Sequence, residues 1–154
     1  KLGETISDTF DVVISCDNSF AHCLNDDDLA AALTSIKSRL KPGGLLLVSI
    51  RDYDPLVANK PIFNSECVQD TPDGRRLAFQ VWDWASDGHR YGVHQFLIKE
   101  NDGAYEIQHF ESELRALLRE EIISAVRDAG FEEVRWHDPE ANGYYQPIVT
   151  ARNR

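Results

Sequence analysis

The segment 10-FDVVISCDNSFAHC-23 decides the fold class of this 154-residue chain. Residues 10–15 form a nearly continuous apolar run, which is typical of a strand buried on both faces of a parallel sheet. The run ends in the small polar residues Cys16, Asp17 and Asn18. We therefore expect this loop to lie at the carboxyl end of a strand, where open α/β sheets bind their ligands.

The next forty residues complete a strand–helix–strand unit. One apolar stripe recurs at helical spacing: Leu29, Leu33, Ile36 and Leu40. Pro42-Gly43-Gly44 is expected to end this helix, and the run 45-LLLVSI-50 predicts a second buried strand. Two strands joined by a crossover helix run parallel to each other, so both are expected to end at the same edge of the sheet.

The middle of the chain has the period-two alternation of antiparallel strands. Three strands are predicted, over residues 76–84, 91–99 and 104–114, and we interpret residues 70–115 as an antiparallel insertion. Most of the aromatic side chains in this region are expected in its core: Phe79, Trp82, Trp84, Tyr91, Phe96, Tyr105 and Phe110.

The last third returns to an α/β pattern. The segment 119-REEIISAVRDAGF-131 predicts an amphipathic helix, with Gly130 as a left-handed cap. Strands are expected over residues 131–136 and 146–152. The prediction is thus a single α/β domain over residues 1–154 that carries the antiparallel insertion.

Composition narrows the class of protein. The net charge of −10 disfavours nucleic acid, whose binding requires phosphates to be neutralised. No apolar run is long enough to span a bilayer, so no membrane contact is expected. The three cysteines, an odd number without a CxxC pair, favour the reducing cytoplasm over a disulfide framework. Because HExxH spacing is also absent, no metal site is expected.

Two polar residues are expected to converge at the ends of the first two strands. If these strands are neighbours, Asn18 and Arg51 face one crevice at the sheet edge. A lone arginine there can instead be solvated or ion-paired, and an asparagine can simply form a turn. Tyr53, two residues after Arg51, can point the same way or pack in the core.

Several motifs resemble one enzyme family. FDVVIS, NSFAH and LKPGGLLLVSI together look like the second half of a class I S-adenosylmethionine-dependent methyltransferase, and AGF followed by YYQPIVTARN resembles that family's closing β-hairpin. CDNSFAHC followed by SIRDYD is similar to the glycine/sarcosine N-methyltransferase group. The implied fold is the C-terminal part of a Rossmann-like methyltransferase sheet with an antiparallel β insertion.

The resemblance also implies site residues. Cys16, Asp17 and His22 would lie beside the methionyl end of S-adenosylmethionine, while Asn18 and Arg51 would face the acceptor, a small-molecule substrate. Arg51 would hold a carboxylate, which suits a planar guanidinium. No catalytic residue is assigned, because His22 can be a base or a structural residue. Asp17 stands where this group is expected to have glycine, which weakens glycine as the substrate.

The family's Gly-rich cofactor loop has no counterpart in the sequence. We therefore expect the C-terminal portion of a longer enzyme, which by itself binds S-adenosylmethionine weakly or not at all, and whose exposed strand edges favour a homodimer. The expected activity is N-methylation of a small amine or amino acid. The alternative is a non-catalytic methyltransferase-like module for binding or oligomerisation; a Rossmann-like dehydrogenase fits the PGG-strand and the aromatic insertion less well.

Overall fold

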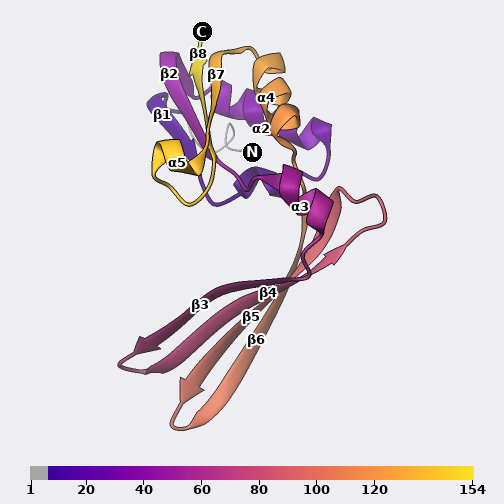
Figure 1. Ribbon diagram of the computed structural model, residues 1–154. Helices are drawn as coiled ribbons and strands as arrows, with labels where there is room; N and C mark the ends of the chain where they lie inside the picture. The colour runs from indigo at the N-terminus through magenta and orange to yellow at the C-terminus, as the bar shows by residue number, and fades with distance from the viewer. Residues whose placement is uncertain (1–6) are drawn as a thin grey trace. The chain divides into compact units, whose positions relative to one another are not determined.

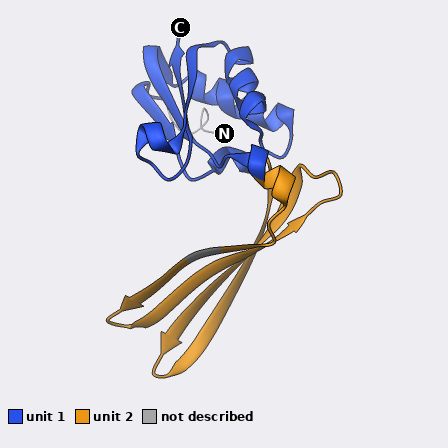
Figure 2. Ribbon diagram, in the orientation of Figure 1, with its two compact units in different colours: residues 1–55, 117–154 blue, residues 56–116 orange. Residues whose placement is uncertain are grey.

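The computed structural model describes residues 7–154, except the side chains of Ser65 and Glu66. The chain divides into two compact units (Figure 2), and it passes from one to the other within helix α3 (Tyr53–Asn59) and again between Ala116 and Leu117. Unit 1 contains residues 1–55 and 117–154, and unit 2 contains residues 56–116. Each unit has its own four-stranded sheet.

The sheet of unit 1 has the strand order β1-β2-β8-β7 (Figure 1). Its strands are β1 (Phe10–Ser15), β2 (Leu40–Ser49), β8 (Ile148–Asn153) and β7 (Phe131–His137). β1 and β2 are parallel, with Val13 opposite Leu46, whereas β8 is antiparallel to both of its neighbours. The predicted parallel pair and the mixed α/β class are therefore confirmed.

Two helices pack against this sheet and contact each other: α2 (Asp26–Lys37) and α4 (Arg119–Asp128). The Asn25 side chain caps α2 by accepting the Asp28 N–H at 2.8 Å. Each helix buries one apolar stripe, formed by Leu29, Leu33 and Ile36 in α2 and by Ile122, Ile123 and Val126 in α4. Gly130 follows α4 with φ of +81°, the left-handed conformation that favours glycine.

The expectation that β1 is buried on both faces is wrong. Val12 and Ile14 are 45% and 60% exposed, while the side chains of Leu46 and Val48 on β2 are completely buried. Burial therefore alternates along these strands, because the described helices cover one face of the sheet only. β2 is also the only sheet neighbour of β1 in residues 7–154.

The predicted helix stop at Pro42-Gly43-Gly44 is displaced. Helix α2 ends at Lys37, and β2 already begins at Leu40. The β1–β2 register shifts between Phe10 and Val12, which pair with Leu40 and Leu45. The proline and glycines thus lie in an irregular stretch of β2, where no ladder hydrogen bond is needed from the proline.

Unit 2 is an antiparallel meander of four strands, one more than the sequence predicted. They are β3 (Phe63–Thr71), β4 (Gly74–Trp84), β5 (Arg90–Asn101) and β6 (Ala104–Arg115). The sequence analysis missed β3, whose register with β4 shifts between Ser65 and Cys67 and so breaks the alternation of side chains. The antiparallel region accordingly begins before residue 70.

The aromatic side chains of unit 2 are only partly in its core. Trp82 and Tyr91 are buried, and Trp84 stacks on Tyr91 with ring centroids 4.8 Å apart. Tyr105 and Phe110 are more than half exposed, so these two lie outside the core. Both lie on β6, which is an edge strand of this sheet.

Asp87 closes the turn between β4 and β5 and gives unit 2 a pH dependence. Its carboxylate accepts hydrogen bonds from the backbone N–H groups of His89 and Arg90, at 2.9 and 3.0 Å, and from the Arg90 guanidinium at 2.9 Å. The His89 and Arg90 donors hold the pKa of Asp87 at about 2, below its ordinary value of 3.8. Ionised Asp87 therefore stabilises the folded state fully at pH values above its pKa in the unfolded chain. This stabilisation is lost as the pH falls through the pKa of Asp87 in the folded state.

We expect Asp87→Asn to lower the melting temperature of unit 2 at neutral pH, because the ionised acceptor is lost. The difference from the wild type should shrink between about pH 4 and pH 2, where the wild-type carboxylate becomes protonated. Thermal unfolding followed by circular dichroism measures this, with Asp102→Asn in the β5–β6 turn as a matched control. A difference that stays constant down to pH 2 would contradict the assignment.

Candidate cofactor and acceptor site

The loop after β1 is fastened to the end of β2. The Asn18 N–H donates to the Ser49 carbonyl at 3.2 Å, and the Asp17 N–H donates to the Ser49 hydroxyl at 2.9 Å. Asp17 and Asn18 both have left-handed backbone conformations, with φ of +55° and +64°. Asp and Asn tolerate this conformation better than other non-glycine residues, so the loop can turn sharply at the strand end.

The Asn18 side chain joins the two strand ends. It is buried, and its amide nitrogen donates to the Tyr53 hydroxyl at 2.6 Å. Its amide oxygen accepts the backbone N–H of Arg51 at 3.2 Å. The structure thus brings Asn18, Arg51 and Tyr53 together, although each role in acceptor binding stays a prediction. Tyr53 is fully buried, which places it in the core as well as beside Asn18.

The carboxylate of Asp17 lies next to two tyrosines that the sequence analysis did not assign to the site. Tyr144 and Tyr145 donate hydrogen bonds to the same oxygen, Asp17 Oδ1, at 3.1 and 2.5 Å. The Tyr145 hydroxyl, followed by that of Tyr144, lowers the pKa of Asp17, and the same hydrogen bond raises the pKa of Tyr145. The site therefore presents an ionised carboxylate at neutral pH.

Cys16 and His22 occupy the ends of the same loop. Cys16 has an exposed free thiol, and its carbonyl oxygen accepts the N–H of Ser19 at 3.4 Å. A short 3-10 helix, η1 (Ser19–His22), buries Phe20 and Ala21 and leaves His22 exposed. The predicted contacts of Cys16, Asp17 and His22 with a cofactor stay predictions.

Arg119, the first residue of α4, organises a second polar cluster in unit 1. Its backbone N–H donates to Asp54 at 3.2 Å, and its guanidinium lies 3.0 Å from Asp138 and 3.7 Å from Asp52. The guanidinium also stacks on the Trp136 ring, 4.5 Å from the centroid. These contacts connect the segment after β2 to the C-terminal part of the chain.

One carboxylate oxygen and one side-chain amide oxygen, both buried in unit 1, have no hydrogen-bond donor among the residues that the structure describes. They are Asp52 Oδ1 and Gln146 Oε1. An unpaired buried acceptor is costly, so each is a point at which a ligand N–H or O–H would be favourable. Nothing in the local sequence around either residue signals this, because the burial depends on the tertiary arrangement.

Comparisons with known proteins bear on the fold of the chain. No family model matches the chain. A 55-residue stretch is 44% identical to glycine N-methyltransferase of Mus musculus, and this match covers 33% of the chain and 19% of the mouse protein. Among solved structures, the sugar N-methyltransferase KedS8 of Streptoalloteichus has a TM-score of 0.74 at 14% identity. This match covers 97% of the chain and 58% of KedS8.

The S-adenosylmethionine-bound structure of CalS10, an amino pentose methyltransferase of Micromonospora echinaspora, is also similar. Its TM-score is 0.72 at 14% identity, over 97% of this chain and 60% of CalS10. The chain therefore spans about three fifths of the solved enzymes that it matches and one fifth of the mouse relative. In the described residues, no helix is both long and apolar enough to cross a membrane. This chain has the fold of the C-terminal portion of S-adenosylmethionine-dependent methyltransferases.

Proposed function

We propose that this chain is part of an S-adenosylmethionine-dependent N-methyltransferase that acts on a small amine or amino acid. The observation that carries the proposal is the hydrogen-bonded junction of the two parallel strand ends, in which Asn18 fixes Arg51 and Tyr53. The similarity to sugar, amino pentose and glycine N-methyltransferases supports the nitrogen acceptor.

The residues of the junction suit the binding of an amino acid. A guanidinium grips a carboxylate through two parallel hydrogen bonds, so Arg51 would fix the acid group of the acceptor. Such a grip orients the neutral amine for an in-line displacement, in which the new N–C bond forms as the S–C bond breaks. Positioning of this kind supplies much of the rate without a dedicated base.

The loop after β1 fits the methionyl end of S-adenosylmethionine. That cofactor carries a methyl group on a positively charged sulfonium, next to an ammonium group. The ionised carboxylate of Asp17 has the complementary charge, and the tight backbone turn at Asp17 and Asn18 lets main-chain groups approach closely. The sequence has no Gly-rich segment for the opposite end of the cofactor.

The proposal is tested on the natural protein that contains these 154 residues. S-adenosylmethionine carrying a labelled methyl group is incubated with small amines and amino acids, and the methylated products are identified by mass spectrometry. We expect transfer to nitrogen and stoichiometric release of S-adenosylhomocysteine. Failure to bind S-adenosylmethionine, or binding without transfer to any amine, would reject the enzyme and favour the non-catalytic module.

Asp17→Asn should weaken the binding of S-adenosylmethionine to this protein about tenfold. The substitution keeps the size of the side chain but removes the charge that faces the cofactor. Isothermal titration calorimetry measures the effect. Asp11→Asn is the matched control, because Asp11 lies on β1, the strand before this loop, and pairs with Lys41 at 2.9 Å. Equal affinity in both variants would remove Asp17 from the cofactor site.

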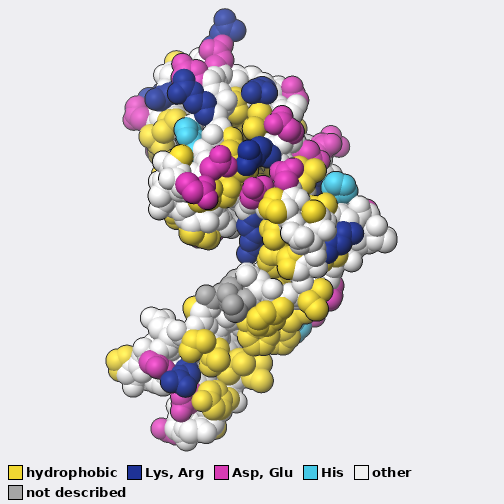
Figure 3. Space-filling view, in the orientation of Figure 1, with side chains coloured by type: hydrophobic (Ala, Val, Ile, Leu, Met, Phe, Trp, Pro, Cys, Tyr) yellow, Lys and Arg dark blue, Asp and Glu magenta, His cyan; other side chains and the backbone are white. Residues whose placement is uncertain are grey.

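The homodimer expected from the sequence stays a prediction. Several exposed apolar side chains lie on one face of the unit 2 sheet: Phe63, Val68 and Ile107. Apolar side chains are visible over β3–β6 in Figure 3. An exposed apolar face of this kind is a candidate surface for the association of two copies.

A further inference from the structure

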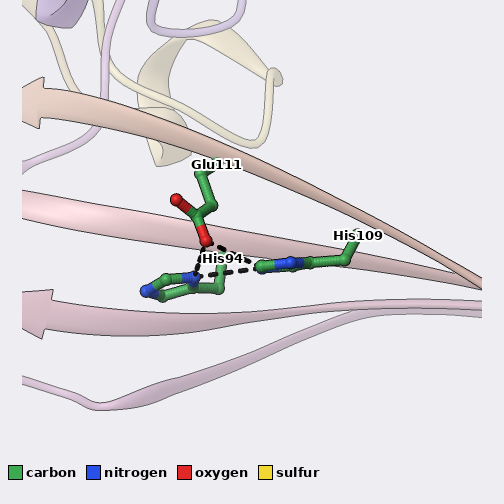
Figure 4. Close-up of side chains that lie close together, drawn as sticks. All are labelled: His94, His109 and Glu111. Atoms are coloured by element: carbon green, nitrogen blue, oxygen red, sulfur yellow. Dashed lines mark hydrogen bonds and ion pairs between the residues drawn. The ribbon is translucent and has the colours of Figure 1, made fainter.

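A cluster of two histidines and two acidic residues lies on the antiparallel sheet of unit 2. His94 on β5 is directly opposite Glu111 on β6, and His109 is opposite Phe96 on the same pair of strands. Directly paired residues point to the same face of a sheet, and so do residues two apart along a strand. The side chains of His94, His109 and Glu111 therefore share one face and converge there (Figure 4).

The three side chains bring their donor atoms to one point. Nδ1 of His94 lies 3.0 Å from Nε2 of His109, and Oε1 of Glu111 lies 3.5 and 3.8 Å from these two nitrogens. Tetrahedral Zn²⁺ with ligands at 2.0–2.1 Å places its donor atoms about 3.3 Å apart. The observed separations differ from this value by at most about 0.5 Å, so small side-chain rotations would complete the geometry.

The other nitrogen of His94 is held as in known metal sites. Its Nε2 lies 3.0 Å from Oδ2 of Asp83 on β4. Because a carboxylate accepts hydrogen bonds, Nε2 carries the proton and Nδ1 keeps its lone pair for the cluster. Metal-binding histidines typically donate their second N–H to a carboxylate in this way, which fixes both the tautomer and the ring orientation.

The His109 ring is also held in place before any ion binds. It stacks on Phe96, with ring centroids 4.7 Å apart and an angle of 17° between the rings, and it lies nearly parallel to His94. The side chains of both histidines are about one third exposed, so an ion can reach them from solvent. Three converging donors would leave a fourth position open for water or another ligand.

We propose that His94, His109 and Glu111 form a binding site for a divalent transition metal ion, Zn²⁺ in the first place, with Asp83 positioning His94. The two imidazoles favour Zn²⁺ over Mg²⁺ or Ca²⁺, which prefer oxygen ligands. The ion would connect β5 to β6 and, through Asp83, to β4. The proposal concerns unit 2 alone and does not depend on methyl transfer.

The test is calorimetric titration of the untagged chain with Zn²⁺, with Mg²⁺ as a comparison. We expect one Zn²⁺ per chain and a higher melting temperature when it binds, because the ion binds the folded state. X-ray absorption at the zinc edge should show two imidazole ligands. His109→Gln and Glu111→Gln each remove a direct ligand. They should weaken Zn²⁺ binding by more than the roughly 10–100-fold that is typical when a residue that hydrogen-bonds a metal ligand is replaced.

Asp83→Asn should weaken Zn²⁺ binding about tenfold, in line with a partner that orients the ligand. His89→Gln is the matched control, because His89 is an exposed histidine in the β4–β5 turn, and it should leave the affinity unchanged. Circular dichroism of each variant checks that the sheet is retained. Absence of Zn²⁺ binding to the wild type, or equal affinity in the wild type and His109→Gln, would overturn the proposal.

Discussion

Asn18→Leu is expected to destabilise unit 1 by about 2–5 kcal/mol. The substitution removes the hydrogen bonds that Asn18 makes with the Tyr53 hydroxyl and with the Arg51 N–H, and the loss of each costs about 0.5–1.5 kcal/mol. Leucine must also adopt the left-handed backbone at φ of +64°, which costs about 1–2 kcal/mol for most residues. The effect is large because the one buried Asn18 side chain forms hydrogen bonds with both Arg51 and Tyr53.

Urea unfolding followed by circular dichroism measures this loss, and hydrogen exchange at the Arg51 amide localises it. Tyr53→Phe removes only the hydroxyl and should cost about 1–2 kcal/mol, since the Asn18 amide then loses one acceptor. Asn101→Leu, at an exposed turn of unit 2, is the control and should stay within about 0.5 kcal/mol. If Asn18→Leu and the control unfold alike, the Asn18 junction does not hold the strand ends together.

Arg51→Ala is expected to lower kcat/KM about 100-fold for an amino-acid acceptor in the natural protein that contains this chain. The figure corresponds to ~2.7 kcal/mol, within the range of about 1.5–3 kcal/mol for hydrogen bonds to charged groups. Arg51→Lys should recover only part of the activity, because an ammonium group keeps the charge but cannot form two parallel hydrogen bonds. Most of the change is expected in KM, since the carboxylate is bound before and during transfer.

The decisive comparison uses acceptors with and without a carboxylate. Arg51→Ala should affect the amino acid strongly and the corresponding simple amine little. Arg135→Ala on β7, an exposed arginine of the same unit, controls for a general change in surface charge. An equal loss with both acceptors would mean that Arg51 supports the fold rather than the substrate, which was the alternative for a lone arginine at a strand end.

The sequence alone determined the α/β part of the fold, because its signals are local. An apolar run and a capped amphipathic helix predict β1, α2 and β2, and a helical crossover of that length permits only a parallel pair. The position of Asn18 and Arg51 at neighbouring strand ends follows from the same topology. The alternation of apolar residues likewise identified β4, β5 and β6, although the irregular β3 left no such pattern.

Only the tertiary structure decided which side chains meet. Tyr145 reaches Asp17, 128 positions away in sequence, because β8 lies next to β2 in the sheet. His94 and His109 are fifteen residues apart, and the register of β5 against β6 places them and Glu111 on one face. The exposure of Val12 and Ile14 on β1 likewise depended on which face of the sheet the helices cover. Strand register, strand order and coverage arise from long-range packing, which no local pattern of residues encodes.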